Sequence, residues 1–296
     1  MRFRYTHGVL NSMLEFLTGD DVYSHIVMSR TASDQLFLVV EGPSDYPFFN
    51  DRVDLDAIEV VPAYGRDNLI RVVEIVDQRN EDDVMGLRDR DFVGILEPEP
   101  SSSQMICTDD YDLDATLIQR TTAAERVVAA FSDPDIRAAH VAKANADETA
   151  VIVRLLVADI GYLRLASQRH NLGLSLRRFP VQDVTDVDGL RLDEAALVQI
   201  AKGRSPECDT NESAILEHLR AERSSVPADS VICGHDAASL LALLISRAWG
   251  GHTNSAKVVL ASIHAAVPRD EFTSLELATR VEQWANQRGR ERAWVV

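Results

Sequence analysis

Cysteine is scarce in this sequence, and its three residues are spread along the chain. Cys107, Cys208 and Cys233 form no CxxC pair, so they resemble neither a zinc ribbon nor a disulfide framework. Free thiols are typical of proteins in a reducing compartment. Apolar residues make up 46% of the 296 residues, which is enough for a substantial core. We therefore expect a folded cytoplasmic protein that does not depend on cross-links.

Long apolar runs and glycine-rich nucleotide motifs are also missing. The apolar stretch LLALLI near residue 243 is far shorter than the roughly 18 residues of a membrane span. The first residues, MRFRYTHGVL, lack the long apolar core of a signal peptide. No P-loop and no GxGxxG are present, which argues against a small-molecule phosphotransferase. We expect no membrane association.

Lysine is rare, and the charge is unevenly distributed. Only three of the 30 basic residues are lysines, so any phosphate binding must depend on arginine. The net charge is −17, and residues 1–118 hold 24 acidic and 9 basic residues against 23 and 21 in residues 119–296. The acidic excess could supply a metal site, form solvated surface or face a basic partner.

The first half of the chain alternates between strand-like and helix-like stretches. Apolar runs predict strands at 36–40, 57–61, 84–87 and 105–107. Helices are expected at 43–49 and 67–77, the second with Asp67 as its N-cap. This order predicts an α/β fold with a parallel sheet flanked by helices.

The second half is expected to be mostly helical. Helices are predicted at 115–131, 148–168, 193–202, 211–223, 237–249, 255–266 and 275–287. An irregular stretch with a possible hairpin at 173–191, a short strand at 230–233 and a turn at 234–236 complete it. We divide the chain into a lead-in with a helix near 10–17 (residues 1–33), an α/β domain (34–118) and a helical domain packed on it (119–296).

Carboxylates follow two of the predicted strands directly. Glu41 follows the first strand, and Asp89 and Asp91 follow the third. Acids at the carboxyl ends of neighbouring parallel strands lie where open α/β sheets place their sites. Clustered carboxylates repel one another, and a bound Mg²⁺ ion, which prefers oxygen ligands, removes that penalty. A metal site for phosphodiester chemistry is therefore predicted, with Asp89 and Asp91 on one face of their strand.

These residues resemble the TOPRIM domain, which topoisomerases, bacterial primases and OLD-family nucleases share. The resemblance covers a strand, Glu41-Gly42, Asp45, and a strand that ends in Asp89-Arg90-Asp91. It implies a Rossmann-like sheet of about four parallel strands, with Glu41 as metal ligand or general acid/base. It also implies that Asp89 and Asp91 bind Mg²⁺ or Mn²⁺.

A closer resemblance extends to about residue 250. The stretches TDDYDLD (108–114), GYLR (161–164) and CGHD (233–236) are similar to landmarks of a TOPRIM family found beside ABC/SMC-like ATPases in anti-phage systems such as PARIS. The resemblance implies a toxic nuclease subunit, a homodimer, that an ATPase partner controls. Asp114 stands where that family has Glu, and its shorter side chain could reach a metal through water or not at all.

Several acidic residues near this site have two interpretations. Asp112 or Asp114 could face the metal, or the acids of 109–114 could cap a helix and form its solvated first turn. Asp45 could support the metal, but stabilisation of the following helix is favoured. His235 could act as general acid/base or touch substrate, but a structural role with Asp236 as N-cap is favoured.

Arginine supplies the candidate nucleic-acid contacts. The stretch 164–178 contains no acid, and its possible substrate-binding residues are Arg164, Arg169, Arg177 and Arg178. His235, outside this stretch, is a further candidate. Arg280–Arg292 is a second basic stretch, and either could be ordinary solvated surface. The favoured function is a Mg²⁺-dependent nuclease acting on RNA, such as tRNA, or on DNA. The alternative is a non-catalytic acidic subunit or sensor docked on an ATPase.

Overall fold

The chain forms two compact units, and both are discontinuous in sequence. The computed structural model describes residues 17–142, 149–253 and 255–295. Unit 1 consists of Met1–Asp89, Glu99–Thr108 and Thr273–Val296, and unit 2 of Arg90–Pro98 and Asp109–Phe272. The two units alternate along the chain, and neither of them begins or ends at residue 118. The expected division into domains at that residue stays a prediction.

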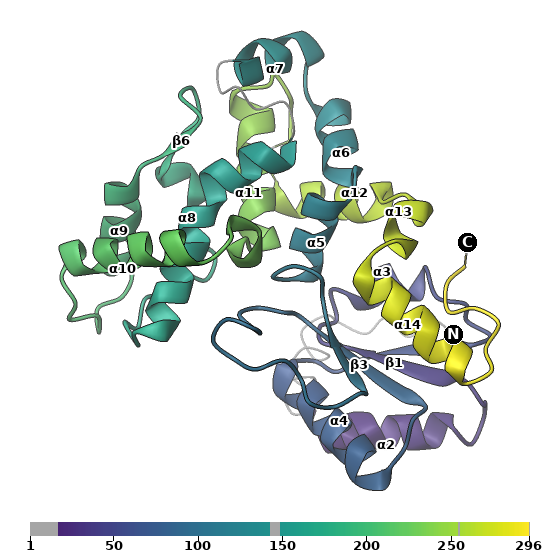
Figure 1. Cartoon of the computed structure of the whole chain (residues 1–296). Coiled ribbons are helices and arrows are strands. Elements are labelled where there is room, and N and C mark those ends of the chain that lie inside the picture. Colours follow the sequence, from purple (N-terminus) through teal and green to yellow (C-terminus); the bar gives the residue numbers. More distant parts are fainter. Residues whose placement is uncertain (1–16, 143–148, 254, 296) are drawn as a thin grey trace, which may run out of the picture. The chain divides into compact units, whose positions relative to one another are not determined.

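Unit 1 is built on a four-stranded parallel sheet with the strand order β2-β1-β3-β4 (Figure 1). Its strands are β1 (Leu36–Val40), β2 (Ile58–Pro62), β3 (Val84–Arg88) and β4 (Met105–Cys107). Every residue of β1 and β3 is buried, because helices cover both faces of the sheet. The predicted α/β class and parallel sheet are therefore confirmed. The ranges of β1 and β4 are reproduced, β3 ends one residue later than expected, and β2 is shifted by one residue at both ends.

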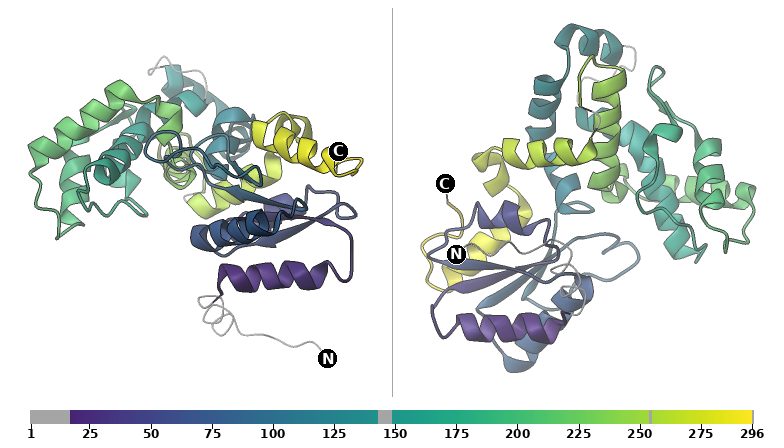
Figure 2. Two further views of the ribbon diagram at one scale, coloured as in Figure 1. Left: turned by 60° about the horizontal axis from the view of Figure 1, so that its bottom comes forward. Right: turned by 180° about the vertical axis from the view of Figure 1, so that it is seen from behind.

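The helices of unit 1 lie on both sides of this sheet. They are α2 (Gly19–Ser29), α3 (Tyr46–Asn50), α4 (Arg66–Arg79) and α14 (Glu276–Gln287). Figure 2 shows α2 and α4 on one side and α14 on the other. The helix expected near 10–17 falls almost entirely outside the described residues, while α2 was not expected. A capping box between Thr18 and Asp21 begins it.

Asp67 does not cap α4 as expected. The N-cap is Gly65, whose φ of 136° suits glycine, and Asp67 lies in the first turn. The helix dipole favours an acid in the first turn. An Asp near the start of a helix can therefore be mistaken for its N-cap.

The C-terminal segment completes unit 1. The Trp284 indole on α14 donates a hydrogen bond to the carbonyl of Asp82 at 3.0 Å. Further along, Trp294 forms an antiparallel bridge with Val53, and its buried indole donates to Ala278 at 2.9 Å. Residues more than 200 positions apart thus share one core.

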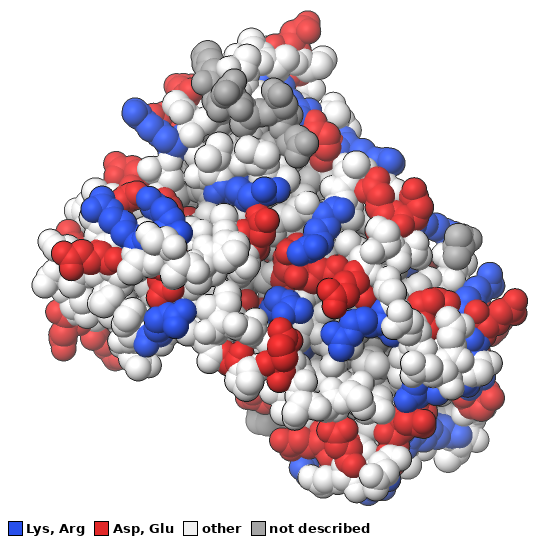
Figure 3. All heavy atoms as spheres, viewed as in Figure 1, with Lys and Arg blue, Asp and Glu red and all other residues white. Residues whose placement is uncertain are grey.

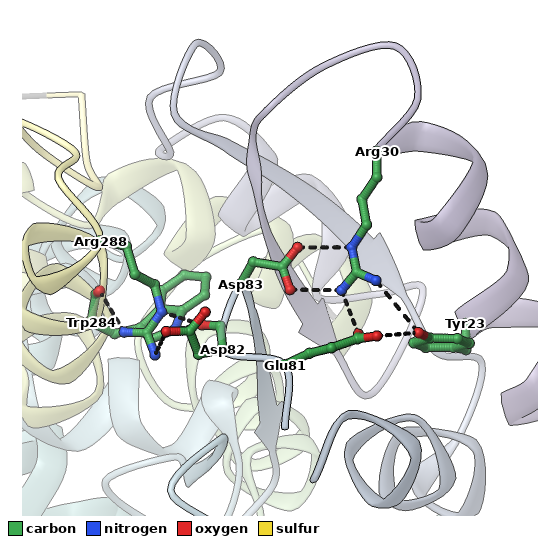
Figure 4. Close-up of polar contacts among 7 residues, drawn as sticks. All are labelled: Tyr23, Arg30, Glu81, Asp82, Asp83, Trp284 and Arg288. Atoms are coloured by element: carbon green, nitrogen blue, oxygen red, sulfur yellow. Dashed lines mark hydrogen bonds and ion pairs between the residues drawn. The ribbon is translucent and has the colours of Figure 1, made fainter. Parts of the chain in front are cut away.

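A charged network holds the connection between α4 and β3 (Figure 4). The Arg30 guanidinium donates to both carboxylate oxygens of Asp83 and to Glu81, with N–O distances of 2.6 to 2.8 Å. Tyr23 donates to Glu81 from α2 at 2.6 Å. Arg288 bonds the carbonyl of Asp82 and pairs with its carboxylate. Both sides of the sheet therefore hold the turn that leads into β3.

Unit 2 is mostly helical where the structure describes it, and it contains a small antiparallel hairpin that pairs Thr185–Asp186 with Arg191–Leu192. Its α-helices are α5 (Leu113–Arg120), α6 (Ala123–Phe131), α7 (Pro134–Val141), α8 (Thr149–Arg169), α9 (Glu194–Gly203), α10 (Glu212–Ser225), α11 (Gly234–Arg247), α12 (Ala256–Ala266) and α13 (Arg269–Thr273). The central helices α8 and α11 are buried along most of their length. The helical character expected for this region is confirmed.

Three local expectations in unit 2 are wrong. The single helix expected at 115–131 is two helices, α5 and α6, which meet at Thr121 and Thr122. The strand expected at 230–233 is a 3₁₀ helix, Ala228–Val231, followed by extended chain. The turn expected at 234–236 is the first turn of α11. The isolated apolar residues Val231 and Ile232 resemble a strand in sequence, but both are buried without a strand partner.

Across the described residues, no helix combines the length and the apolar character that a membrane span needs.

We expect Arg30→Gln to destabilise the protein by about 2 kcal/mol, because charge-assisted hydrogen bonds to two carboxylates are lost. Urea unfolding measures this change in free energy. Arg71→Gln is the matched control, since Arg71 pairs with the exposed Asp20 and screening weakens such a pair. Equal destabilisation by the two substitutions would contradict a structural role for the Arg30 network.

Candidate functional site

Glu41 and Asp89 lie together at the carboxyl ends of two neighbouring strands. β1 pairs directly with β3, with Val40 opposite Leu87, so both strands end at the same edge of the sheet. The backbone N–H of Asp89 donates to Oε2 of Glu41 at 3.2 Å. The structure therefore brings these two predicted site residues together. Their chemical roles stay predictions.

Asp91 belongs to unit 2 and does not continue β3. The strand ends at Arg88, so the expectation that Asp89 and Asp91 share one face of a strand is wrong. Asp91 adopts a φ of 46°, a left-handed conformation that Asp tolerates better than most residues. Its N–H donates to the carbonyl of Tyr111 at 2.7 Å. This bond joins segment 90–98 to the chain just before α5.

The two acids at the sheet edge have the donor chemistry of a magnesium site. Mg²⁺ is typically bound by one or two protein carboxylates and keeps several waters, so Glu41 and Asp89 could serve as its protein ligands. Throughout residues 17–142, 149–253 and 255–295, no three His, Cys, Asp or Glu side chains form a group that could hold a metal. A site of the zinc type, with three or four protein ligands, is therefore not preformed among these residues.

Asp112 holds the beginnings of two helices of unit 2 together. As the N-cap of α5 it accepts the N–H of Ala115 at 2.6 Å, and it also accepts the N–H of Gly234, the first residue of α11, at 3.0 Å. Glycine is required there, because a Cβ would lie 2.2 Å from the Cβ of Asp114. Burial, together with the charge of Asp114, raises the pKa of Asp112 to about 7.

Asp114 lies between two histidines. Nε2 of His264 is 2.6 Å from Oδ1 of Asp114, and Nδ1 of His235 is 3.7 Å from Oδ2. Burial raises the pKa of Asp114, but the two histidines outweigh burial and lower it to about 2. The same contact with Asp114 raises the pKa of His235. Asp112 and Asp114 are thus neighbouring carboxyls with opposite pKa shifts, which is common at functional sites.

His264 on α12 is a member of this cluster that sequence reasoning missed. It lies 150 residues from Asp114 in a helix without a recognisable motif. The available signal is its position in the last turn of a mainly apolar helix.

The remaining acids of this region have structural contacts. Asp110 is buried and accepts two hydrogen bonds from Arg120 at 2.7 and 2.8 Å, an arrangement that ties both ends of α5 together. Asp45 occupies the N-cap position of α3, but its side chain makes no capping hydrogen bond. The favoured interpretation of Asp45, stabilisation of the first turn of this helix, stays a prediction.

His235 is exposed, whereas its neighbour Asp236 is buried. The expected N-cap role of Asp236 is wrong, because Cys233 is the N-cap of α11 and Asp236 lies inside the helix. The Asp236 carboxylate instead pairs with Nη2 of Arg164 on α8 at 2.7 Å. Burial lowers the pKa of Arg164, but the charge of Asp236 outweighs it and the net shift is upward.

The four predicted substrate arginines divide into two pairs. Arg164 and Arg169 hold the buried carboxylates of Asp236 and Glu222, which gives both a structural role. Arg177 and Arg178 lie exposed on the loop after α8 and make no side-chain ion pair with any described residue. Arg164, Arg177, Arg178 and His235 all line one pocket of unit 2.

We expect Asp112→Asn to reduce the pH dependence of stability. The folded-state pKa of Asp112, about 7, lies above its ordinary value. Between about pH 4 and pH 7 the group is therefore ionised in the unfolded chain but protonated in the folded one, so the free energy of unfolding falls as the pH rises through this range. Asn cannot ionise, so the variant should lose less stability than the parent between pH 5 and pH 8. Urea unfolding at both pH values in EDTA measures the difference.

Asp193→Asn is the control, because Asp193 caps α9 with an exposed side chain. Its pH profile should run parallel to that of the parent. Identical profiles for Asp112→Asn and the parent would contradict the assigned shift.

Comparisons with known proteins do not identify this chain. A scan of protein-family models and a search of curated proteins both found no match. The function is therefore argued from the residues and their geometry.

Proposed function

We propose that the protein is a metal-dependent nuclease of the TOPRIM type. The observation that carries the proposal is the pair of acids at the carboxyl ends of β1 and β3, joined by the Asp89 N–H to Glu41 hydrogen bond. The parallel sheet supports it, because it has the architecture that the TOPRIM resemblance implies. Asp91, Asp112 and Asp114 belong to unit 2, and the proposal does not depend on them.

The chemistry follows from the donors at this edge. Glu41 and Asp89 would hold Mg²⁺ or Mn²⁺, and such an ion supplies a Lewis acid and a water of lowered pKa for attack on a phosphodiester. The Asp89 N–H donates to one oxygen of Glu41 and orients it. An ionised Glu41 is the form that binds metal or accepts a proton from the attacking water.

The proposed substrate is RNA, such as tRNA, or DNA. The resemblance at 108–114, 161–164 and 233–236 supports a toxic effector of an anti-phage system, controlled by an ABC/SMC-like ATPase and acting as a homodimer. The structure ties two of these stretches to one another, because Asp112 accepts the Gly234 N–H. The beginnings of α5 and α11 are therefore joined to each other within unit 2.

The alternative, an acidic docking subunit, is weaker than the charge of residues 1–118 implies. Unit 1 includes the C-terminal segment and so holds 21 acidic and 12 basic residues, a net charge of −9. Arg288, Arg290 and Arg292 of that segment pair with Asp82, Asp34 and Asp54. Figure 3 shows basic side chains among the acidic ones on the face it draws.

We expect Glu41→Gln and Asp89→Asn each to lower cleavage by about 100-fold or more, because each removes a charge that holds the metal. Cleavage of labelled tRNA and duplex DNA with added Mg²⁺ or Mn²⁺ measures activity, and toxicity on expression provides a second assay. Calorimetric titration with Mn²⁺ measures metal binding independently of activity.

Glu74→Gln is the matched control, since it removes the same charge from an exposed position on α4. It should leave cleavage and metal binding unchanged. Full activity in both site variants would overturn the proposal, as would equal loss in the control.

A further inference from the structure

A polar pocket of unit 2 lies between the loop after α8 and the beginning of α11. Its volume is about 550 Å³, within the range of small-molecule sites. Its charged and titratable lining residues are Arg164, Arg177, Arg178, Cys233, His235 and Asp236. The site predicted at Glu41 and Asp89 belongs to the other unit, so this pocket has to be explained separately.

The charges that line this pocket favour an anion. Asp236 is the only carboxylate among the lining residues, and its pairing with Arg164 neutralises it. Arg177 and Arg178 have no such partner among the described residues. Carboxylates pair with seven other arginines of unit 2, namely Arg120, Arg137, Arg154, Arg169, Arg191, Arg220 and Arg223. The pocket therefore keeps two uncompensated guanidinium charges.

A third guanidinium adds a buried donor. Nη1 of Arg164 is buried and has no hydrogen-bond partner among the described residues, although Nη2 bonds Asp236 and the carbonyl of Leu176. A buried donor without a partner is costly to the fold. Because Asp236 already neutralises Arg164, the charge available to a ligand comes from Arg177 and Arg178.

The loop that carries the two unpaired arginines is held in place. Arg204 donates to the carbonyls of Ser175 at 3.3 Å and Arg177 at 2.8 Å, and the N–H of Ser175 donates to the hydroxyl of Ser205 at 2.7 Å. Arg178 is kept at a φ of 50°, which is uncommon for arginine. A loop fixed in advance loses less entropy on binding, so it favours affinity.

We propose that this pocket binds a phosphomonoester group, as found in a free nucleotide or at the phosphorylated end of a nucleic-acid strand, through Arg177 and Arg178. A phosphate dianion matches two unpaired guanidinium groups in charge, and their planar donors fit its oxygens. Leu174, Leu176 and Gln168 line the same pocket, and they offer an apolar and amide surface to the attached nucleoside. This inference does not rest on the proposed metal site.

Binding to the full-length protein tests the proposal, with calorimetry as the readout. The probes are adenosine 5′-monophosphate against adenosine, and a short RNA with a 5′-phosphate against the same RNA with a 5′-hydroxyl. The phosphate should strengthen binding about tenfold or more in at least one pair, and the pair that responds identifies the source. The double variant Arg177→Gln/Arg178→Gln should lose that preference.

Arg247→Gln/Arg269→Gln is the control, because it removes two exposed arginines of unit 2 that do not line this pocket. It should keep the preference for phosphate, and Glu41→Gln should keep it as well. Equal binding of phosphorylated and unphosphorylated probes would overturn the inference. The same loss in the control would also overturn it, since only general charge would then be acting. Circular dichroism checks that every variant folds.

Discussion

Burial of β1 and β3 on both faces is the constraint on which unit 1 depends. All ten residues of the two strands are buried, and all but Arg88 are apolar or glycine. The first carboxylates therefore follow directly after the strands, at Glu41 and Asp89. Parallel pairing in register then brings these two residues together, and the hydrogen bond from the Asp89 backbone orients the Glu41 carboxylate. The candidate site is thus a consequence of how the sheet is packed.

The entry to β3 depends on charged residues from distant parts of the chain. Arg30 holds Glu81 and Asp83, and the C-terminal helix holds Asp82. Because Arg30, Glu81 and Asp83 are only partly exposed, they interact in a medium less screening than water, and their ion pairs contribute more than surface pairs do. The strong acidity of residues 1–118 is partly balanced within unit 1 by the C-terminal arginines. Sequence-local charge is therefore a poor guide to the charge of the folded unit.

Unit 2 uses carboxylates in two different ways. Asp110, Asp236 and Glu222 are buried and paired with arginine, which makes them structural. The pKa values of Asp112 and Asp114 are shifted in opposite directions, because burial dominates at Asp112, whereas contacts with His235 and His264 outweigh burial at Asp114. Arg177 and Arg178 show the opposite imbalance, because they line a pocket and have no carboxylate partner among the described residues. Charged groups that the fold holds without a partner of opposite charge are places where ligands are expected.

The parallel sheet and the acids that follow its strands could be predicted from the sequence, because both depend on short apolar runs and on the residue directly after each run. Other features depend on how the chain folds. The break between α5 and α6, the left-handed conformation of Asp91 and the role of Gly65 in place of Asp67 follow from local packing that periodicity does not record. The pairing of Arg164 with Asp236 and of His264 with Asp114 joins residues 72 and 150 positions apart. Which arginines remain available to a ligand depends on such long-range pairs, so only the folded chain distinguishes Arg177 and Arg178 from Arg164 and Arg169.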